Sequence, residues 1–435
     1  MAKKLYIKTY GCQMNAYDSD RMADVLAPLG YVRGDTPEKA DLVILNTCHI
    51  REKAAEKVFS ELGRLKRLKA ERPMILAVGG CVAQAEGEEI LKRSPQVDLV
   101  FGPQTYHRLP ELVARAERAR GQGVLDIDIP PEPKFDSLPE TGARGPSAFI
   151  AIQEGCDRFC TYCVVPYTRG GEYCRPAGDV LAEIRRLAET GTCEITLLGQ
   201  NVNAWQSQGM GLGGLIRAVA GIAGIERVRY TTSHPAHVDE DLIRAHGEEE
   251  KLMPYLHLPV QAGSDRILKA MNRGHDADDY RLLAHRLKEA RPDLALSSDF
   301  IVGFPGETEA DFQATLDLID EVGFVLAYSF KFSPRPGTGA AAMQDQVPED
   351  VKTERLARLQ AKLEASQRRW YENMVGREMD VLFDRPGRYK GQLLGRSPFM
   401  QPVHVKAPTD LMGRLARVCV TQSHANSLAG LLVTS

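Results

Sequence analysis

The 435-residue sequence predicts a mixed α/β protein in three parts: an N-terminal α/β domain on a parallel sheet, a central partial (β/α)6 barrel, and a small C-terminal all-β barrel. Two observations carry this prediction. Short apolar strands alternate with segments of helical period through most of the chain, which is typical of parallel sheets. After residue 374 the helical period stops, and short strand-like runs punctuated by Gly and Pro replace it.

The N-terminal domain, residues 1–128, repeats a strand, a turn and a helix four times. The expected strands are residues 5–9, 42–46, 74–78 and 97–101, and the expected helices are 19–29, 52–70, 86–93 and 110–120. Cys12, Cys48 and Cys81, here called the N-terminal triad, each follow the end of one of the first three strands. Because ligands of open α/β sheets bind outside the carboxyl ends of the strands, we expect these three thiols to converge at one edge.

Residues 129–146 are rich in proline and lack periodicity, so we expect a linker. The central region, residues 147–374, then repeats strand and helix about six times and ends in a long polar helix from residue 349. The expected strands are 148–153, 194–198, 228–231, 255–258, 295–302 and 326–332, with helices such as 179–190 and 309–322. Six units are fewer than the eight of a closed barrel, and the open side could admit a large substrate.

Cys156, Cys160 and Cys163, here called the central triad, form a Cys-x-x-x-Cys-x-x-Cys run just after the first central strand. Three thiolates can hold three irons of a cubane, and the fourth iron is then open to bind and reduce a small molecule. The run also lies at the face of a barrel where chemistry is usual. A structural zinc site is the alternative, but zinc usually takes four ligands with paired Cys-x-x-Cys spacing.

Charge distinguishes the C-terminal module, residues 375–435, from the rest of the chain. It carries eight Lys or Arg against four Asp or Glu, a net charge of +4, whereas the whole chain has −3. The expected strands are 379–383, 391–394, 403–405 and 415–421. A small basic β-barrel at a terminus commonly binds RNA.

The composition, with 43% hydrophobic and 26% charged residues, fits a globular protein. No signal peptide and no stretch long enough to span a membrane are apparent, so we expect a cytoplasmic protein with no membrane partner. In a reducing compartment nine cysteines favour metal ligation or catalysis over disulfides.

Several motifs resemble the radical S-adenosylmethionine (SAM) methylthiotransferases. They are Thr-Tyr-Gly-Cys-Gln-Met-Asn (9–15), Asn-Thr-Cys (46–48), Gly-Gly-Cys (79–81), Cys-Thr-Tyr-Cys-Val-Val-Pro-Tyr-Thr-Arg-Gly (160–170), Leu-Leu-Gly-Gln-Asn-Val-Asn (197–203), Pro-Val-Gln-Ala-Gly-Ser (259–264) and Ser-Pro-Arg-Pro-Gly-Thr (333–338). The resemblance covers the whole chain, and the C-terminal module is similar to a TRAM RNA-binding domain. The motifs at 9–15 and 160–170 resemble the MiaB branch. The chain departs from the family at Cys174-Arg175-Pro176, where Ser-Arg-Pro is usual, and at Gly339, where Pro is usual.

The resemblance implies an enzyme that methylthiolates carbon 2 of N(6)-isopentenyladenosine beside the tRNA anticodon. One SAM would act as the radical source and a second as the methyl donor. The central triad would hold a [4Fe-4S] cluster with exchangeable SAM, and the N-terminal triad an auxiliary [4Fe-4S] cluster that handles sulfur. The implied SAM contacts are Tyr162, between two ligands, and four residues at or beyond strand ends: Gln200, Ser233, Gln261 and Arg273.

The expected partners are the anticodon stem-loop of tRNA, a low-potential electron donor such as a flavodoxin or ferredoxin, and a sulfur donor, and nothing demands more than a monomer. Two alternatives stay open. One is a sister methylthiotransferase acting on threonylcarbamoyladenosine or on a ribosomal-protein aspartate. The other is a non-catalytic iron–sulfur RNA-binding redox sensor.

Other reactive side chains have weaker signals. His234 and His257 lie at strand ends and could line the pocket, and Asp299 and Glu307 could be catalytic acids, although structural roles are the more common outcome for such residues. Three further thiols are expected to be core or incidental: Cys174, Cys193 and Cys419.

Overall fold

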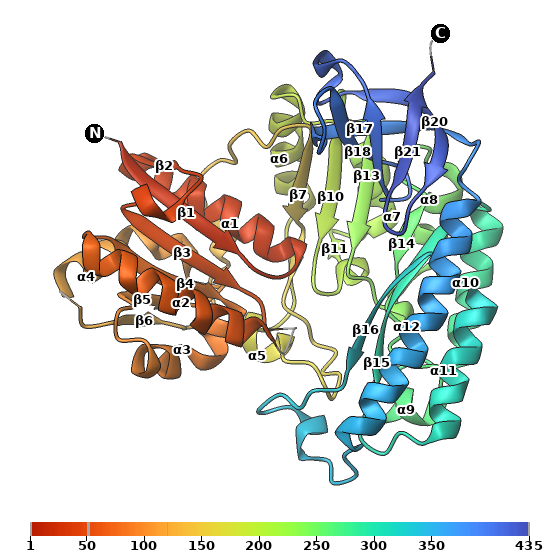
Figure 1. Ribbon diagram of the computed structural model, residues 1–435, viewed down its shortest axis with the longest axis horizontal. Coiled ribbons are helices and arrows are strands. Elements are labelled where there is room, and N and C mark those ends of the chain that lie inside the picture. Colours follow the sequence, from red (N-terminus) through yellow and green to blue (C-terminus); the bar gives the residue numbers. More distant parts are fainter. Residues whose placement is uncertain (1, 50–52, 120, 434–435) are drawn as a thin grey trace.

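The structure, a computed structural model, describes residues 2–49, 53–119 and 121–433. Three bodies follow one another along the chain, as Figure 1 shows: an N-terminal α/β domain, a central strand–helix domain, and a C-terminal β-barrel at the end of a long helix. The predicted fold class is confirmed.

The N-terminal domain is a six-stranded parallel sheet in the order β2-β1-β3-β4-β5-β6. Its strands are β1 (Lys3–Thr9), β2 (Tyr31–Arg33), β3 (Leu42–Thr47), β4 (Ile75–Gly80), β5 (Leu99–Phe101) and β6 (Val124–Asp126). Its helices are α1 (Gln13–Leu26), α2 (Lys53–Glu71), α3 (Cys81–Arg93) and α4 (Leu109–Ala119). Helices α1 and α4 cover one face and α2 and α3 the other, because two separate apolar cores lie on the two faces. The central strand β3 is buried along its whole length, as expected for a parallel strand covered on both sides.

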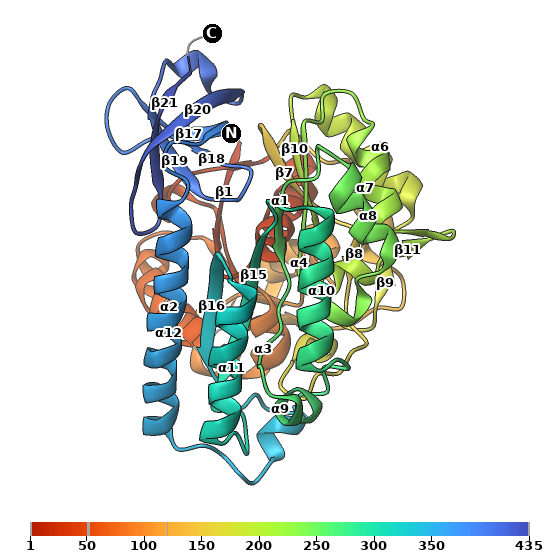
Figure 2. The same ribbon diagram turned by 90° about the vertical axis from the view of Figure 1, so that its right-hand side faces the viewer.

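The central domain has six parallel strands that form an open barrel (Figure 2). The strands are β7 (Ser147–Ala151), β10 (Glu194–Leu198), β13 (Arg227–Thr231), β14 (Tyr255–His257), β15 (Ala295–Val302) and β16 (Leu326–Lys331). They form two three-stranded sheets, β13-β10-β7 and β14-β15-β16, which a parallel bridge between Val228 and Leu252 joins.

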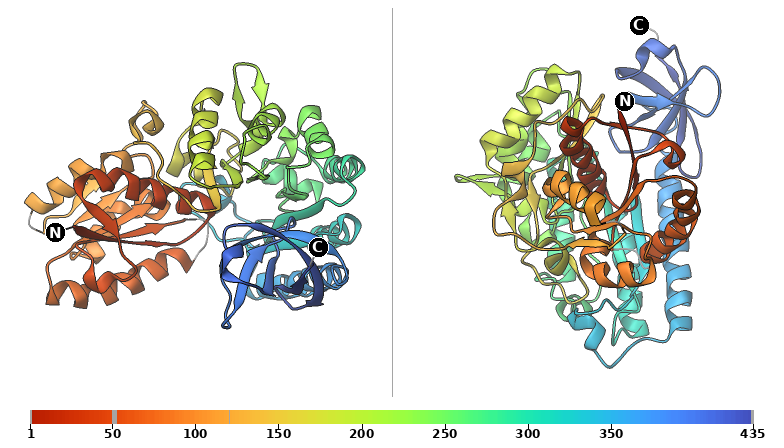
Figure 3. Two further views of the ribbon diagram at one scale, coloured as in Figure 1. Left: turned by 90° about the horizontal axis from the view of Figure 1, so that it is seen from above. Right: turned by 90° about the vertical axis from the view of Figure 1, so that its left-hand side faces the viewer.

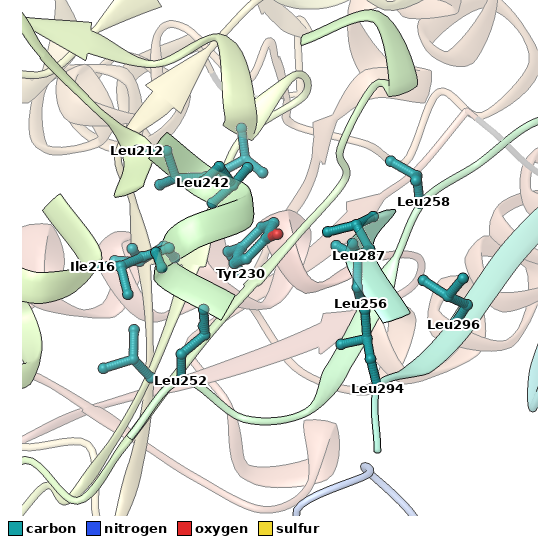
Figure 4. Close-up of a cluster of buried hydrophobic side chains, with 14 of the residues drawn as sticks. Leu212, Ile216, Tyr230, Leu242, Leu252, Leu256, Leu258, Leu287, Leu294 and Leu296 are labelled. Carbon is teal, nitrogen blue, oxygen red and sulfur yellow. The ribbon is translucent and has the colours of Figure 1, made fainter. Parts of the chain in front are cut away.

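Helices follow these strands, most of them on the outside of the barrel. They are α5 (Val165–Arg169), α6 (Ala177–Glu189), α7 (Leu212–Ala220), α8 (Glu240–Glu248), α9 (Asp265–Ala270), α10 (Ala277–Ala290), α11 (Glu309–Val322) and the long α12 (Glu349–Glu372). Two short antiparallel pairs complete the domain: β8 (Gln153–Glu154) with β9 (Tyr173–Cys174), and β11 (Gln206–Ser207) with β12 (Met210–Gly211). The barrel core is mainly Leu and Ile from both strands and helices, including Leu256 and Leu296 from strands and Leu287 from α10 (Figure 4).

The C-terminal module is a closed barrel in the order β17-β18-β19-β21-β20. Its strands are β17 (Glu378–Pro386), β18 (Gln392–Arg396), β19 (Pro402–Lys406), β20 (Leu415–Ser423) and β21 (Leu428–Leu432). Its core continues into Ala295 at the start of β15 and Met374 just beyond α12. The module therefore packs at the amino ends of the central strands. Figure 3 shows the module, in blue, beside the end of α12, and the N-terminal domain in red and orange.

The elements differ from the predicted ones in a few places. Strands β2, β6, β9, β11, β12 and β21 are additional to the predicted set, and the predicted strand 148–153 is divided between β7 and β8. Helix α1 begins at Gln13 rather than Ser19, because the Asn15 side chain accepts a hydrogen bond from the Cys12 backbone N–H (3.4 Å) and starts the helix earlier. Helix α3 begins at Cys81 rather than Glu86, and Glu86 itself has a non-helical φ of −129° inside it. Glu52 and Arg120, ends of two predicted helices, lie outside the described residues.

The predicted domain boundaries at residues 128, 146 and 374 fall between elements, and they stay predictions. No helix in the described ranges combines the length and the apolar composition needed to cross a membrane.

Candidate active site

The central triad lies on the loop between β8 and α5, at the carboxyl end of the first central strand. The loop is closed at its base by a hydrogen bond from the Cys156 backbone N–H to the Gly170 carbonyl (3.3 Å) and by the β8–β9 pairing. Gly155 has a φ of +77°, and a Cβ there would lie 1.9 Å from the Gly171 carbonyl oxygen. Only glycine fits that close approach, so the residue before Cys156 fixes how the chain turns into the loop.

A cavity of about 250 Å³, here called the central cavity, opens beside this loop. Its lining includes all eight residues predicted for this site: Cys156, Cys160, Cys163, Tyr162, Gln200, Ser233, Gln261 and Arg273. Two residues at the strand ends beside the cavity have an unusual backbone conformation. Thr232 (φ 70°) and Gln261 (φ 79°) are non-glycine residues in the left-handed region, where strain often marks functional sites.

The cavity wall holds polar atoms that lack partners within the described part of the chain. They are Ser233 Oγ, His234 Nε2, Arg158 Nε and Arg273 Nε. Buried polar atoms are nearly always hydrogen-bonded, so these atoms fit a polar ligand in the cavity. The unpartnered atom of His234 is a hydrogen-bond donor. Its Nδ1 accepts a hydrogen bond from the Ala236 backbone N–H (3.2 Å), so the neutral ring carries its proton on Nε2. Burial, aided by the charge of Arg273, lowers the pKa of His234 and keeps the ring neutral.

Gln200 and Arg273 of the cavity also make hydrogen bonds within the protein. The Gln200 side-chain oxygen accepts a hydrogen bond from the Gly155 backbone N–H (2.6 Å) and so ties a strand end to the cysteine loop. Arg273 donates to the Pro259 carbonyl (2.6 Å) and to Cys160 Sγ (3.6 Å). Its guanidinium therefore lies against one thiol of the central triad.

The chemistry of the central thiols fits a metal cluster. Burial raises the pKa of Cys163 to about 12 and also raises the pKa of Cys156. A thiol with so high a pKa becomes a thiolate only where a cation offsets the burial, and coordinated iron supplies such a charge. The donor set of the central triad, three thiols around one cavity, therefore suits a cluster better than a role as free nucleophiles.

The N-terminal triad comes together at the carboxyl edge of the first sheet. Cys12 precedes α1, Cys48 follows β3, and Cys81 is the first residue of α3, directly after β4. Strands β1, β3 and β4 are neighbours in the sheet, so the three loops lie side by side. The packing is close enough that a Cβ on Gly11 (φ +127°) would lie 2.2 Å from the Cβ of Cys48. The predicted convergence of these loops is what the sheet order produces.

Charge and hydrogen bonding act on these thiols. A hydrogen bond from Cys48 lowers the pKa of Cys12 to about 6, and the positive charge of Arg169 adds to this effect. Burial raises the pKa of Cys81, and Arg169 opposes that rise through its charge and a hydrogen bond. No three His, Cys, Asp or Glu side chains in the described ranges converge on one metal ion. Each thiolate of a cubane binds its own iron, so a cluster does not require such a single point.

The central cavity reaches from the central triad toward the N-terminal domain. Its lining includes His49, the residue after Cys48, together with Phe330, Lys331 and Arg335 from the region of β16 and the segment after it. In Figure 1, α5 lies where the two domains meet. The two cysteine triads therefore border the same region of the molecule. Sequence reasoning missed His49 as a lining residue, because it reaches the cavity only where the N-terminal domain docks. It also missed Arg335, although its position four residues beyond β16 was a signal of the same kind as the other strand-end residues.

The residues with weaker sequence signals fall into two groups, those that line the central cavity and those that do not. His234 and Asp299 line the central cavity. His257 instead pairs with Ser297 (2.8 Å) and lies 3.5 Å from Asp299 Oδ1. Glu307 is buried in an ion pair with Arg355 (2.9 Å) and accepts a hydrogen bond from the Gly303 backbone N–H, which is a structural arrangement. Cys174, Cys193 and Cys419 are half-buried outside the two triads.

The C-terminal barrel is docked through buried arginines of the central domain. Arg229 donates to the Pro398 (2.8 Å) and Ser397 (2.9 Å) carbonyls, and Arg227 donates to the Arg396 carbonyl (3.0 Å). The loop between β17 and β18 is exposed and carries Arg388, Tyr389 and Lys390. A basic loop with an exposed aromatic ring is a common feature of RNA-binding surfaces.

Three family models match successive parts of the chain. They are the Uncharacterized protein family UPF0004 over residues 4–102, the Radical SAM superfamily over residues 150–319, and the TRAM domain over residues 372–433. The second match implies a [4Fe-4S] cluster and SAM at the central site.

Solved structures share the fold over much of the chain. The cobalamin-bound radical SAM methyltransferase TsrM from Kitasatospora setae has a TM-score of 0.57 at 15% identity and covers 78% of this chain and 77% of its own. The cobalamin-dependent radical SAM enzyme OxsB has a TM-score of 0.54 at 12% identity and covers 83% of this chain and 56% of its own. At these identities the likeness concerns the fold alone.

Curated relatives match the chain over its full length. A tRNA-2-methylthio-N(6)-dimethylallyladenosine synthase of Maricaulis maris (strain MCS10) is 59% identical over 447 residues, which cover 100% of this chain and 98% of the relative. The synthase of Cereibacter sphaeroides (strain ATCC 17029 / ATH 2.4.9) is 61% identical over 431 residues, which cover 99% and 98%. The chain therefore belongs to the tRNA-2-methylthio-N(6)-dimethylallyladenosine synthase family of radical SAM enzymes.

Proposed function

We propose that this chain methylthiolates carbon 2 of N(6)-dimethylallyladenosine, also called N(6)-isopentenyladenosine, next to the anticodon of tRNA. One SAM serves as the radical source and a second as the methyl donor. The observation that carries the proposal is the pair of cysteine triads that border one region, with a cavity at the central one whose wall holds unpartnered polar atoms. The names of the full-length relatives support the same substrate. Carbon 2 of adenine has an unactivated C–H bond that no side-chain base can deprotonate, so a cofactor must supply the chemistry.

The central triad would hold the [4Fe-4S] cluster, which supplies one-electron reduction that no side chain can provide. The residues around it bind and orient SAM. Ser233 and His234 offer an unpartnered hydroxyl and an N–H donor, and Arg273 offers positive charge beside Cys160. Tyr162, Gln200 and Gln261 complete the proposed contacts.

The N-terminal triad would hold the auxiliary [4Fe-4S] cluster, with a position open for sulfur. The low pKa of Cys12 and the cation at Arg169 favour thiolates there. Its place beside the central cavity would put sulfur within reach of an adenine presented to the radical site.

The C-terminal barrel would hold the anticodon stem through phosphate contacts, and the adenine would leave its stack to enter the cavity, which costs least in a single-stranded loop. We expect the enzyme to act as a monomer in the cytoplasm, with a flavodoxin- or ferredoxin-like electron donor and a separate sulfur donor.

The decisive experiment counts iron in anaerobically reconstituted protein. We expect about eight irons in the wild type and about four in either triple variant, Cys156/Cys160/Cys163→Ala or Cys12/Cys48/Cys81→Ala. Cys419→Ala, which removes a thiol from the C-terminal barrel, is the matched control and should leave the count unchanged. About four irons in the wild type would overturn the auxiliary cluster.

Product analysis separates the alternatives. With SAM and dithionite, wild type should release 5′-deoxyadenosine, whereas a redox sensor would not. In tRNA from a deletion strain, the 2-methylthio derivative of dimethylallyladenosine should be absent and should return on complementation. Loss of methylthiolated threonylcarbamoyladenosine, or of the ribosomal-protein modification, would instead identify the sister activity, which the relatives do not favour.

A further inference from the structure

Four charged side chains are buried together where the N-terminal domain meets the central cysteine loop. Asp18 comes from α1, Lys134 from the linker, Glu154 from β8 and Arg169 from α5. Each side chain is at most 4% exposed. Because they come from three separate regions of the chain, they link the two domains. No local sequence pattern predicts such a contact.

The group, here called the interdomain ion network, is electrically balanced. Arg169 donates from Nη1 to Glu154 (2.6 Å) and from Nη2 to Asp18 (2.7 Å). Lys134 Nζ donates to Glu154 (2.7 Å) and to the Pro103 carbonyl (2.8 Å) and lies 3.8 Å from Asp18. Two cations thus face two anions. Buried charges persist only when they are paired and hydrogen-bonded, so the network holds a specific geometry more than it adds stability.

The network touches both cysteine sites. Glu154 lies two residues before Cys156, and Arg169 ends the helix that begins two residues after Cys163. Their ion pair therefore closes the base of the loop that carries the central triad. Asp18 lies on α1, which starts directly after Cys12, and α5 packs against α3, which starts at Cys81. Arg169 also acts on Cys81 by charge and hydrogen bonding and on Cys12 by charge.

We propose that Arg169 is a positioning residue that joins the two cysteine sites: it fixes the N-terminal triad relative to the central loop and sets a positive charge beside the auxiliary cluster. The inference rests on the proposed auxiliary cluster at the N-terminal triad. A cation and a hydrogen-bond donor near a cluster with thiolate ligands favour its reduced form and raise its reduction potential. Asp18 has the opposite sign and moderates this effect.

The test isolates the auxiliary cluster in full-length protein with Cys156/Cys160/Cys163→Ala. In that background Arg169→Gln removes the charge, and we expect the auxiliary cluster to become about tenfold harder to reduce, which is about 59 mV lower for a one-electron couple. Arg169→Lys keeps the charge and should restore most of the shift. Asp18→Asn should move the midpoint the other way. The midpoints are read by redox titration monitored by electron paramagnetic resonance.

Arg229→Gln is the matched control in the same background. Arg229 is also a buried interdomain arginine, bonded to Glu194 and to carbonyls of the C-terminal barrel. Its loss should leave the midpoint unchanged. A general structural disturbance would shift Arg169→Gln and Asp18→Asn in the same direction, and that result, or no shift in either, would overturn the inference.

A second readout follows the docking itself. In the reconstituted wild-type background, hydrogen exchange of residues 129–146 and of α5 should quicken in Arg169→Gln and Asp18→Asn but not in Arg229→Gln. Unchanged exchange would overturn the positioning half. If the triple-alanine background binds no iron, the auxiliary cluster itself fails, and with it the charge half of the inference. Iron that binds with an unmoved midpoint refutes only the role of Arg169.

Discussion

Ser233 and Ser264 carry the same hydroxyl in opposite situations. Ser233 Oγ is buried at the central cavity without a partner in the described ranges, whereas Ser264 Oγ donates to Asp311 (2.6 Å) away from the cavity. A hydroxyl left unpartnered in the protein carries a cost that a hydrogen bond to a bound ligand offsets. The two serines therefore separate a binding role from a structural one.

Ser233→Ala should weaken SAM binding about five- to tenfold, equivalent to about 1–1.4 kcal/mol for one hydrogen bond, and leave the melting temperature unchanged. Ser264→Ala should do the reverse: it should lower the melting temperature and leave SAM affinity unchanged. Anaerobic equilibrium dialysis and a thermal melt of each variant give both numbers. Unaltered SAM affinity in Ser233→Ala would remove that residue from the proposed site.

Gly155 tests the turn into the central loop. An alanine there would meet the Gly171 carbonyl oxygen at 1.9 Å in a backbone with φ +77°, so the loop must shift. We expect Gly155→Ala to lose most of the central cluster, measured as iron content and visible absorbance. Gly178→Ala in α6 is the control, because a Cβ there meets nothing within 4 Å, and it should bind iron as the wild type does. Full iron content in Gly155→Ala would show that the loop tolerates the side chain.

At the scale of elements, β13 and α8 hold a buried histidine that makes the central domain sensitive to acid. His246 Nε2 lies 2.6 Å from the Tyr230 hydroxyl, and Arg291 donates to the His246 carbonyl (3.2 Å). Burial, with the charge of Arg291, lowers the pKa of His246 to about 3 from the ordinary 6.5. The native ring therefore stays neutral at pH values where the unfolded chain binds a proton.

The contribution of His246 to the free energy of unfolding should consequently be fully present above about pH 6.5. It should fall by about 1.4 kcal/mol per pH unit as the pH drops toward 3. His246→Gln should flatten that slope by about one proton, although it lowers stability at pH 7. His285→Gln, at an exposed position, should leave the slope unchanged. Urea unfolding at pH 7, 6 and 5, followed through the buried Trp205, measures it. Equal slopes in the wild type and His246→Gln would contradict the argument.

The elements also show what sequence could and could not supply. Apolar runs such as β3 and β4 were predictable because burial on both faces demands them. Strand β2 has three residues, two of them exposed, and is a strand only because β1 pairs with it. Strand β21 likewise depends on its partners in the closed barrel. Short strands of this kind have no clear period in their own sequence.

The residues of the candidate site also fall into some that the sequence could predict and some that it could not. The cysteine triads and the strand-end residues were predictable, because the carboxyl ends of parallel strands share one edge. His49 was not, because it reaches the central cavity only through the way the two domains dock. That docking depends on contacts such as the Asp18–Arg169 pair, which joins residues 151 positions apart in the chain. Sequence spacing carries no signal for such a contact.

For the whole molecule, the C-terminal barrel and the central cavity lie at opposite ends of β15. Ala295, its first residue, belongs to the core of the C-terminal barrel, whereas Asp299 and Ile301 line the cavity. Asp299 and Ile301 lie four and six residues beyond Ala295, which is roughly 13–20 Å along the strand. A bound tRNA must cover that distance, so phosphate contacts on the barrel would hold the stem while the loop reaches the cavity.

The exposed loop between β17 and β18 allows a test of whether the C-terminal barrel binds the tRNA stem. Arg388 and Lys390 lack an acidic partner within the described residues, whereas Arg417 lies 3.5 Å from Glu378 and 3.6 Å from Asp380. Neutralising unpaired charges should remove phosphate contacts, and neutralising a paired one should remove little. Arg388→Gln/Lys390→Gln should therefore weaken tRNA binding several-fold and reduce the slope of log affinity against log salt by about 1.4–1.8.

Because this loop belongs to the barrel at the other end of β15 from the cavity, formation of 5′-deoxyadenosine from SAM without tRNA should stay at the wild-type rate. Arg417→Gln, the control, should change the salt slope by less than one contact. Filter binding at a series of salt concentrations, with the deoxyadenosine assay beside it, measures both. If the double variant kept its salt slope, the tRNA stem would have to bind another face, and the end of α12 beside the barrel, with the exposed Arg368 and Arg369, would be the surface to neutralise next.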